Sequence, residues 1–334
     1  MNARHPTLMS PESVASPPEN ASPRAVRRRF DWWQALVRVL ASIEAVRDGQ
    51  VIYVLLAAFS GAGLAVASAQ ASLGRGDTNW AIGQGAAALF IAFYGANAAG
   101  LMSMDRARGV VPRDGWSAVQ DGLGVGHRML LAVLAAVLVV GTLAAGVAGL
   151  YWLSGLPKVG PWLFVLVVPA TVLLLGLTML SVVAVIAPLT GPVVWSGASS
   201  WQACRALVRL VRERLLQSAV LVGGLSLVTG LTGAATSFMV MAGGRVMAEA
   251  SIFVLGVDIK PEMLMAGLMG YNVRVVDLTV PADALPYIRA ATVGGGVVFA
   301  LALVLPTVVY LRGVCEVFLA LQQADVAEAG VEQA

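Results

Sequence analysis

The stretch that decides the fold runs from Trp201 to Gly230 and reads WQACRALVRLVRERLLQSAVLVGGLSLVTG. Its first half is amphipathic, and its second half is apolar without ionisable side chains. The same order occurs twice earlier in the chain, where Trp33-Gln-Ala35 and Trp116-Ser-Ala118 precede other long apolar stretches. Because the three Trp-x-Ala motifs are almost evenly spaced, they predict three copies of one unit, a helix lying on the membrane followed by a transmembrane hairpin.

The composition excludes an ordinary soluble protein. Hydrophobic residues make up 58% of the chain, charged residues only 12%, and the mean hydropathy is +0.80, whereas soluble domains have roughly 45–50% apolar and about 25% charged residues. A helix needs about 20 apolar residues to cross a bilayer. The apolar runs therefore give six candidate spans, near residues 51–72, 80–104, 129–153, 161–187, 216–242 and 290–312. We predict an all-α polytopic membrane protein with six transmembrane helices, arranged as three amphipathic-helix-plus-hairpin units.

The rest of the chain divides around these spans. Residues 1–29 are rich in Pro and Ser and predict a disordered cytoplasmic tail. Residues 325–334 are expected to form a cytoplasmic tail at the C-terminus. The six-span domain covers the residues between the two tails. Its three units are expected at about 30–115, 116–198 and 199–324.

The third unit contains the least ordinary segment, on the outer side at residues 243–289. Loops of this length are usually functional or disordered, and residues 272–280 have the β-branched content of a strand. Its methionines admit two interpretations, a Cu(I) site or flexible filling of apolar gaps. We adopt the second and expect no cofactor.

The basic residues predict the orientation. Most of the 22 Lys and Arg fall in segments on the same side as the N-terminus, so the positive-inside rule places both termini in the cytoplasm. We expect the membrane to be the inner membrane of a bacterium. Cys204 and Cys315 both lie on that side, where thiols stay reduced, and we expect no disulfide.

We expect the helices that open at Trp33, Trp116 and Trp201 to lie at the lipid interface. In the third copy an apolar stripe opposes a basic stripe of Arg205, Arg209 and Arg212. The arginines either recognise anionic lipid or only reach to the headgroups and set the topology. Glycines interrupt the middle copy, so we expect that helix to be short or kinked.

The passage Gly197-Ala-Ser-Ser-Trp201-Gln-Ala-Cys-Arg205-Ala-Leu-Val-Arg209-Leu-Val-Arg212-Glu-Arg214-Leu-Leu resembles bacterial six-span membrane proteins related to the membrane domain attached to some glycerophosphodiester phosphodiesterases. The likeness extends to the hydrophobic layout of most of the chain. It implies a fold rather than an activity, because nothing in the sequence supplies the phosphodiesterase domain.

Small residues recur at every fourth position of the first two spans. They are Ala57, Gly61 and Ala65 on the first span, and Ala88, Ala92, Ala96 and Gly100 on the second. Helices in lipid associate by close packing, so these stripes predict helix–helix contacts, within the chain or with another subunit.

The sequence supplies little for chemistry or for ion transport. The predicted hydrocarbon layer has no ionisable Asp, Glu, Lys, Arg or His of the kind that marks ion pathways. The histidines are His5 and His127 alone, too few for a triad or a metal site. A membrane-embedded lipid enzyme would have only Asp105, Asp114 and Asp121 to offer.

We therefore predict a non-catalytic inner-membrane scaffold or accessory subunit. Its expected partners are membrane lipid and either another membrane protein or a second copy of the chain, and not nucleic acid. The alternative is a permease for lipid or an uncharged solute, which would use the modest polar lining of the spans.

Overall fold

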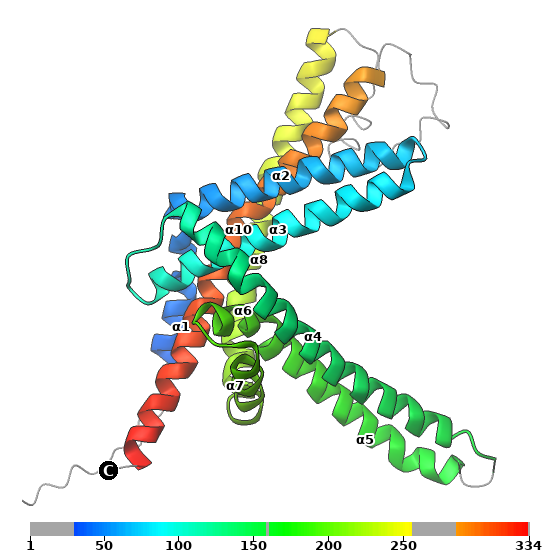
Figure 1. The fold of residues 1–334 in the computed structure, drawn as a ribbon, viewed down its shortest axis with the longest axis vertical. Helices are drawn as coiled ribbons and strands as arrows, with labels where there is room; N and C mark the ends of the chain where they lie inside the picture. The colour runs from blue at the N-terminus through cyan, green and yellow to red at the C-terminus, as the bar shows by residue number, and fades with distance from the viewer. Residues whose placement is uncertain (1–29, 158–159, 256–284, 333–334) are drawn as a thin grey trace, which may run out of the picture.

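The computed structural model describes residues 30–157, 160–255 and 285–332 (Figure 1). All secondary structure in these ranges is helical, and six helices are long and apolar enough to cross a membrane. The elements in chain order are α1 (Trp32–Leu40), the 3₁₀ helix η1 (Ala41–Arg47), α2 (Gly49–Gly74), α3 (Thr78–Ala107), α4 (Gly115–Leu153), α5 (Gly160–Ser181), the π-helix η2 (Val182–Ile186), α6 (Ala187–Trp195), α7 (Ser200–Glu213), α8 (Leu215–Leu255) and α10 (Leu285–Glu332). The predicted all-α polytopic class is confirmed.

The long helices form three hairpins, α2 with α3, α4 with α5, and α8 with α10. Figure 1 shows that the hairpins leave a common core in three different directions. The core contains the first turns of α2, α4 and α8, the last turns of α3, all of α6, the inner face of α7 and the second half of α10. We call this region the junction.

Burial is concentrated at the junction. Its fully buried side chains include Leu55 of α2, Met102 of α3, Leu189 of α6 and Leu321 of α10. Away from it, only 11% of the most apolar window is buried in α4 and in the α5–α6 span, against 50% in Leu301–Ala324 of α10. The spans are therefore held together at one end.

A π-turn carries α5 into the junction. Pro188 has no N–H to donate to the carbonyl of Ala184, four residues earlier. The hydroxyl of Ser218 on α8 donates to this carbonyl at 2.5 Å. This hydrogen bond ties the second hairpin to the third.

The second unit departs from the expected pattern. The sequence predicted a separate helix at Trp116 that is short or kinked. This prediction was wrong, because α4 runs unbroken from Gly115 to Leu153 and includes the span. The glycines in this region allow α4 to approach α3 closely. A Cβ on Gly126 would lie 2.3 Å from Cε1 of Tyr94, and one on Gly122 would lie 3.2 Å from the backbone nitrogen of Ala98.

The third hairpin is longer than expected. Helix α8 continues to Leu255 and α10 begins at Leu285, so both ends of the predicted outer segment are helical. The expected strand at 272–280 lies outside the described residues. Helix α10 also continues to Glu332, through most of the segment predicted as a C-terminal tail.

Candidate functional site

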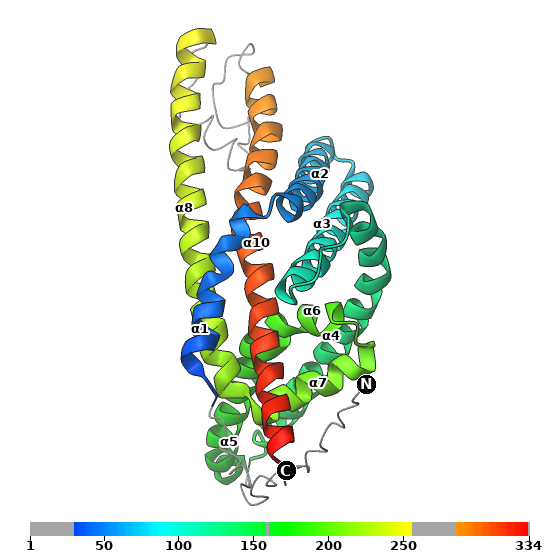
Figure 2. The same cartoon turned by 90° about the vertical axis from the view of Figure 1, so that its left-hand side faces the viewer.

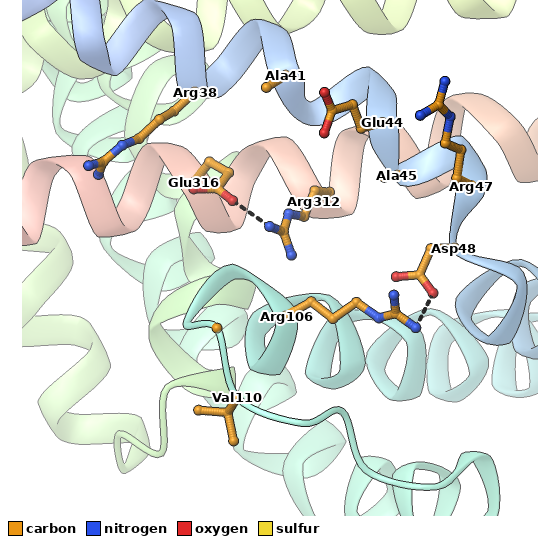
Figure 3. A pocket seen from close by; sticks show the side chains of 11 residues that line it. Arg38, Ala41, Glu44, Ala45, Arg47, Asp48, Arg106, Val110, Arg312 and Glu316 are labelled. Atoms are coloured by element: carbon orange, nitrogen blue, oxygen red, sulfur yellow. Dashed lines mark ion pairs between the residues drawn. The ribbon is translucent and has the colours of Figure 1, made fainter.

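A charged pocket of about 490 Å³ lies at the junction, between η1, the end of α3 and α10 (Figure 3). Its lining comprises Arg38, Ala41, Glu44, Ala45, Arg47, Asp48, Arg106, Gly109, Val110, Arg312 and Glu316. Four arginines and three carboxylates thus share one cavity, with an excess of one positive charge.

Asp48 is the most buried charged group of the pocket, with 8% of its surface exposed. It lies between η1 and α2, and its Oδ1 is 2.6 Å from Nη2 of Arg106 in the last turns of α3. Burial raises the pKa of the Asp48 carboxyl above its usual value, and the Arg106 guanidinium opposes that rise. The pair connects the start of the first span to the end of the second.

The second ion pair of the pocket lies on α10. Arg312 and Glu316 are one turn apart, with 2.8 Å between Nη2 and Oε1. Figure 3 shows the Arg312 guanidinium extending from α10 towards α3, while the Arg106 side chain runs along α3 towards Asp48. Arg38 of α1 donates to Oε1 of Gln323 at 2.7 Å and so ties α1 to α10.

The acidic residues considered for an enzyme are engaged elsewhere. Arg113 bonds Asp105 through two nitrogens, at 2.7 and 3.0 Å, and Asp121 at 2.8 Å. The hydrogen bonds that Arg113 donates to Asp105, together with the attraction of both carboxylates, raise the pKa of Arg113 against the lowering effect of burial. Asp114 caps α4 by accepting from the Trp116 backbone N–H at 3.3 Å. These carboxylates therefore serve ion pairs and a helix cap. Among the described residues, no group of three His, Cys, Asp or Glu could hold a metal ion.

The three predicted interface tryptophans share one local geometry. Trp33, Trp116 and Trp201 are each the second residue of a helix, and all three are exposed. In each copy a capping side chain stands two residues before the Trp, and a buried alanine stands two residues after it. The caps are Asp31, Asp114 and Ser199, and the alanines are Ala35, Ala118 and Ala203. Sequence reasoning missed the caps, which extend the signal to Asp/Ser-x-Trp-x-Ala.

Helix α7 packs one of its faces into the junction. The junction buries Ala203, Leu207 and Leu210, while Trp201 and Val208 point outward. Arg205, Arg209 and Arg212 are also exposed, and the Arg205 guanidinium lies 5.0 Å above the Trp201 ring. The outer face of α7 therefore carries both the tryptophan and the basic stripe.

Helix α1 lies on the other side of the junction from α7. It runs alongside α8 and α10 (Figure 2), and Leu36 fits over Gly224 of α8, where a Cβ would come within 3.3 Å of it. Its outer face is apolar, with Trp33, Val37 and Leu40 exposed. The structure therefore does not gather the three tryptophans into one site.

The small-residue stripes fall partly at helix contacts. On α3, Ala88 is buried, and Ala92 and Ala96 are half-buried. On α2, Ala57 is exposed and Ala65 is half-buried, and a Cβ on Gly61 would lie 3.6 Å from Cγ2 of Ile91 on α3. The tightest approach of the two helices is between Ala58 and Gly95, where a Cβ on the glycine would lie 2.2 Å from that of the alanine.

Gly100, the last member of the α3 stripe, contacts a residue that sequence reasoning missed. The Trp195 indole of α6 is buried between Gly100 and Gly191, and its Nε1 donates to Oδ1 of Asn97 at 3.0 Å. The contact links the first hairpin to the second. No local pattern marks Trp195, because its partners lie on another helix.

Comparisons with protein-family models, curated proteins and solved structures found no match to this chain.

Proposed function

We propose that this multi-pass membrane protein is a non-catalytic scaffold or accessory subunit that holds another membrane component against its hairpins. The observation that carries the proposal is the low burial of the α4–α5 hairpin. This hairpin extends away from the junction, and no other described hairpin packs along its length. In a closed bundle each span turns one side inward. Here Leu138 of α4 and Leu173 of α5 are exposed, so the hairpin offers apolar surface to a neighbour.

The polar side chains of the spans favour this function over a permease. A permease needs polar groups along a continuous path between its helices. In the described spans three polar pairs join neighbouring helices instead: Ser72 with Gln84 at 3.0 Å between α2 and α3, Asn97 with Trp195, and Tyr151 with Thr171 at 2.8 Å between α4 and α5. Polar contacts of this kind commonly join neighbouring helices in lipid.

The proposed orientation places the junction in the cytoplasm of a bacterial cell, at the inner membrane. The arginines around the pocket and on α7 support it through the positive-inside rule. We expect reporter fusions after Gln323 to behave as cytoplasmic and insertions near Asp258 as periplasmic. The opposite result at either site would overturn the six-span topology.

Photo-crosslinking tests the scaffold directly. A photoreactive amino acid is placed at Leu138 or Leu173 in living cells, and at the buried Leu189 as a control. We expect one protein, or a second copy of this chain, to crosslink from the two exposed positions and not from the control. A chain that crosslinks lipid alone, and that carries an uncharged solute into proteoliposomes, would instead be a permease. We also propose that this chain shares its fold with the membrane domain attached to some glycerophosphodiester phosphodiesterases, on the basis of the resemblance of residues 197–216.

A further inference from the structure

The charged pocket has the composition of a binding site rather than of a closed ion-pair network. A network built only for stability would match its charges and leave little space. This pocket has one arginine more than it has carboxylates, and its volume falls within the range of about 300–1,000 Å³ usual for small-molecule sites.

Part of the donor capacity in the pocket is unused. The Nε of Arg106 is buried and has no hydrogen-bond partner among the described residues. The hydrogen bond that Arg38 donates to Gln323 goes to a neutral amide, and the charge of Arg38 also acts on Glu316. A buried guanidinium nitrogen without an acceptor is costly, and an oxyanion between Arg106 and Arg312 would supply one.

The position of the pocket points to the class of oxyanion. Asp48 immediately precedes the first span, and Arg106 lies in the last turns of the second. The pocket is therefore at the depth where a span meets the headgroup layer. Exposed apolar residues adjoin it, among them Ile43 and Val46 of η1 and Val110 after α3. Acyl chains could lie along such residues while a headgroup enters the pocket.

We propose that the pocket binds the phosphate group of an anionic phospholipid, held between Arg106 and Arg312. Guanidinium groups bind phosphate oxygens through paired, charge-assisted hydrogen bonds. Asp48 and Glu316 orient the two guanidinium groups through their ion pairs with Arg106 and Arg312. Bound lipid of this kind would tie η1, α3 and α10 together, a role beyond that of a scaffold for protein.

The test uses a pair of double variants that leave the net charge unchanged. The double variant Arg312→Gln with Glu316→Gln replaces the ion pair on α10 by two neutral amides, so no unpaired charge is left buried. Arg245→Gln with Glu249→Gln is the matched control, because it removes an equivalent pair, 3.1 Å between Nε and Oε1, on the exposed outer part of α8.

The measurement is thermal unfolding of the full chain in neutral detergent, titrated with short-chain phosphatidylglycerol, phosphatidylcholine or inorganic phosphate. Salt at about 0.15 M screens attraction by distant exposed charges. We expect phosphatidylglycerol to raise the Tm of the wild type and of the control equally. Phosphatidylcholine should have a much smaller effect, because its choline ammonium is repelled by the excess of arginine in the pocket. The pocket variant should need at least about ten times more phosphatidylglycerol, because hydrogen bonds to charged groups contribute about 1.5–3 kcal/mol each.

Each outcome decides the proposal. A shift given equally by inorganic phosphate would support a phosphate site whose ligand is soluble rather than lipid. A pocket variant that responds like the wild type, or equal shifts with both lipids, would overturn it. Should the first variant not fold, Asp48→Asn with Arg106→Gln replaces it under the same criteria, since it also removes a pair without changing the net charge.

Discussion

One buried indole shows how single residues join the hairpins. Trp195 fills the space above Gly100, where a Cβ would lie 2.3 Å from Cζ2 of the ring. We expect Gly100→Ala to lower the Tm, since overpacking costs about 1–3 kcal/mol and the helix propensity gained by replacing Gly is at most about 1 kcal/mol. Gly141→Ala on α4 is the control, because nothing lies within 4 Å of its new methyl group. Equal Tm changes in the two variants would show that the contact is loose.

The buried carboxyl of Asp48 gives a pH dependence that differs from that of an ordinary aspartate. Burial raises its folded-state pKa above the ordinary value of 3.8, so the native protein takes up this proton before the unfolded chain does. Stability from this group therefore increases as pH falls through the folded pKa towards 3.8. We expect the wild type to gain stability relative to Asp48→Asn between neutral and mildly acidic pH in chemical unfolding. A trend of the opposite sign would contradict the assignment.

At the scale of one element, α7 combines an inner apolar face with an outer face of tryptophan and arginine. If its outer face lies on anionic headgroups, each arginine adds about 1 kcal/mol of attraction. Replacing Arg205, Arg209 and Arg212 together by Gln should weaken the stabilisation by anionic liposomes, at low salt, by about 3 kcal/mol at most. The six spans should remain inserted. Arg75→Gln with Arg245→Gln, at the far ends of α2 and α8, is the comparison, and an equal loss there would mean a general charge effect.

At the scale of the whole molecule, the three directions of the hairpins have a mechanical consequence. Spans in a flat bilayer tilt by about 0–40° from its normal, so the hairpins should swing towards one another about the junction when the chain is in a membrane. Spin labels at Asp77 and Leu156, near the tips of the first two hairpins and in a Cys204→Ser background, should lie closer in nanodiscs than in Figure 1. Labels at Tyr53 and Leu89, within the first hairpin, should keep their distance. An unchanged tip separation would mean that the junction is rigid.

The sequence alone determined the features that depend on neighbours along the chain. Six spans, their approximate limits and the helical starts at Trp33 and Trp201 follow from hydropathy and local periodicity, which need no knowledge of distant residues. The helix at Trp116 also begins where expected, but its continuation into the span was missed because its glycines look like breaks in isolation. In the structure they serve the close approach of α3 to α4.

Only the tertiary structure decided what meets at the junction. Asp48, Arg106 and Arg312 belong to separate segments, and each looks in the sequence like one more charge flanking a span. The face of α7 that is buried, the partners of Trp195 and the position of α1 along α10 likewise depend on where distant helices cross. Lipid-spanning helices all satisfy the same hydropathy pattern, so that pattern cannot select their neighbours. Packing of small residues and the pairing of buried charges make that selection.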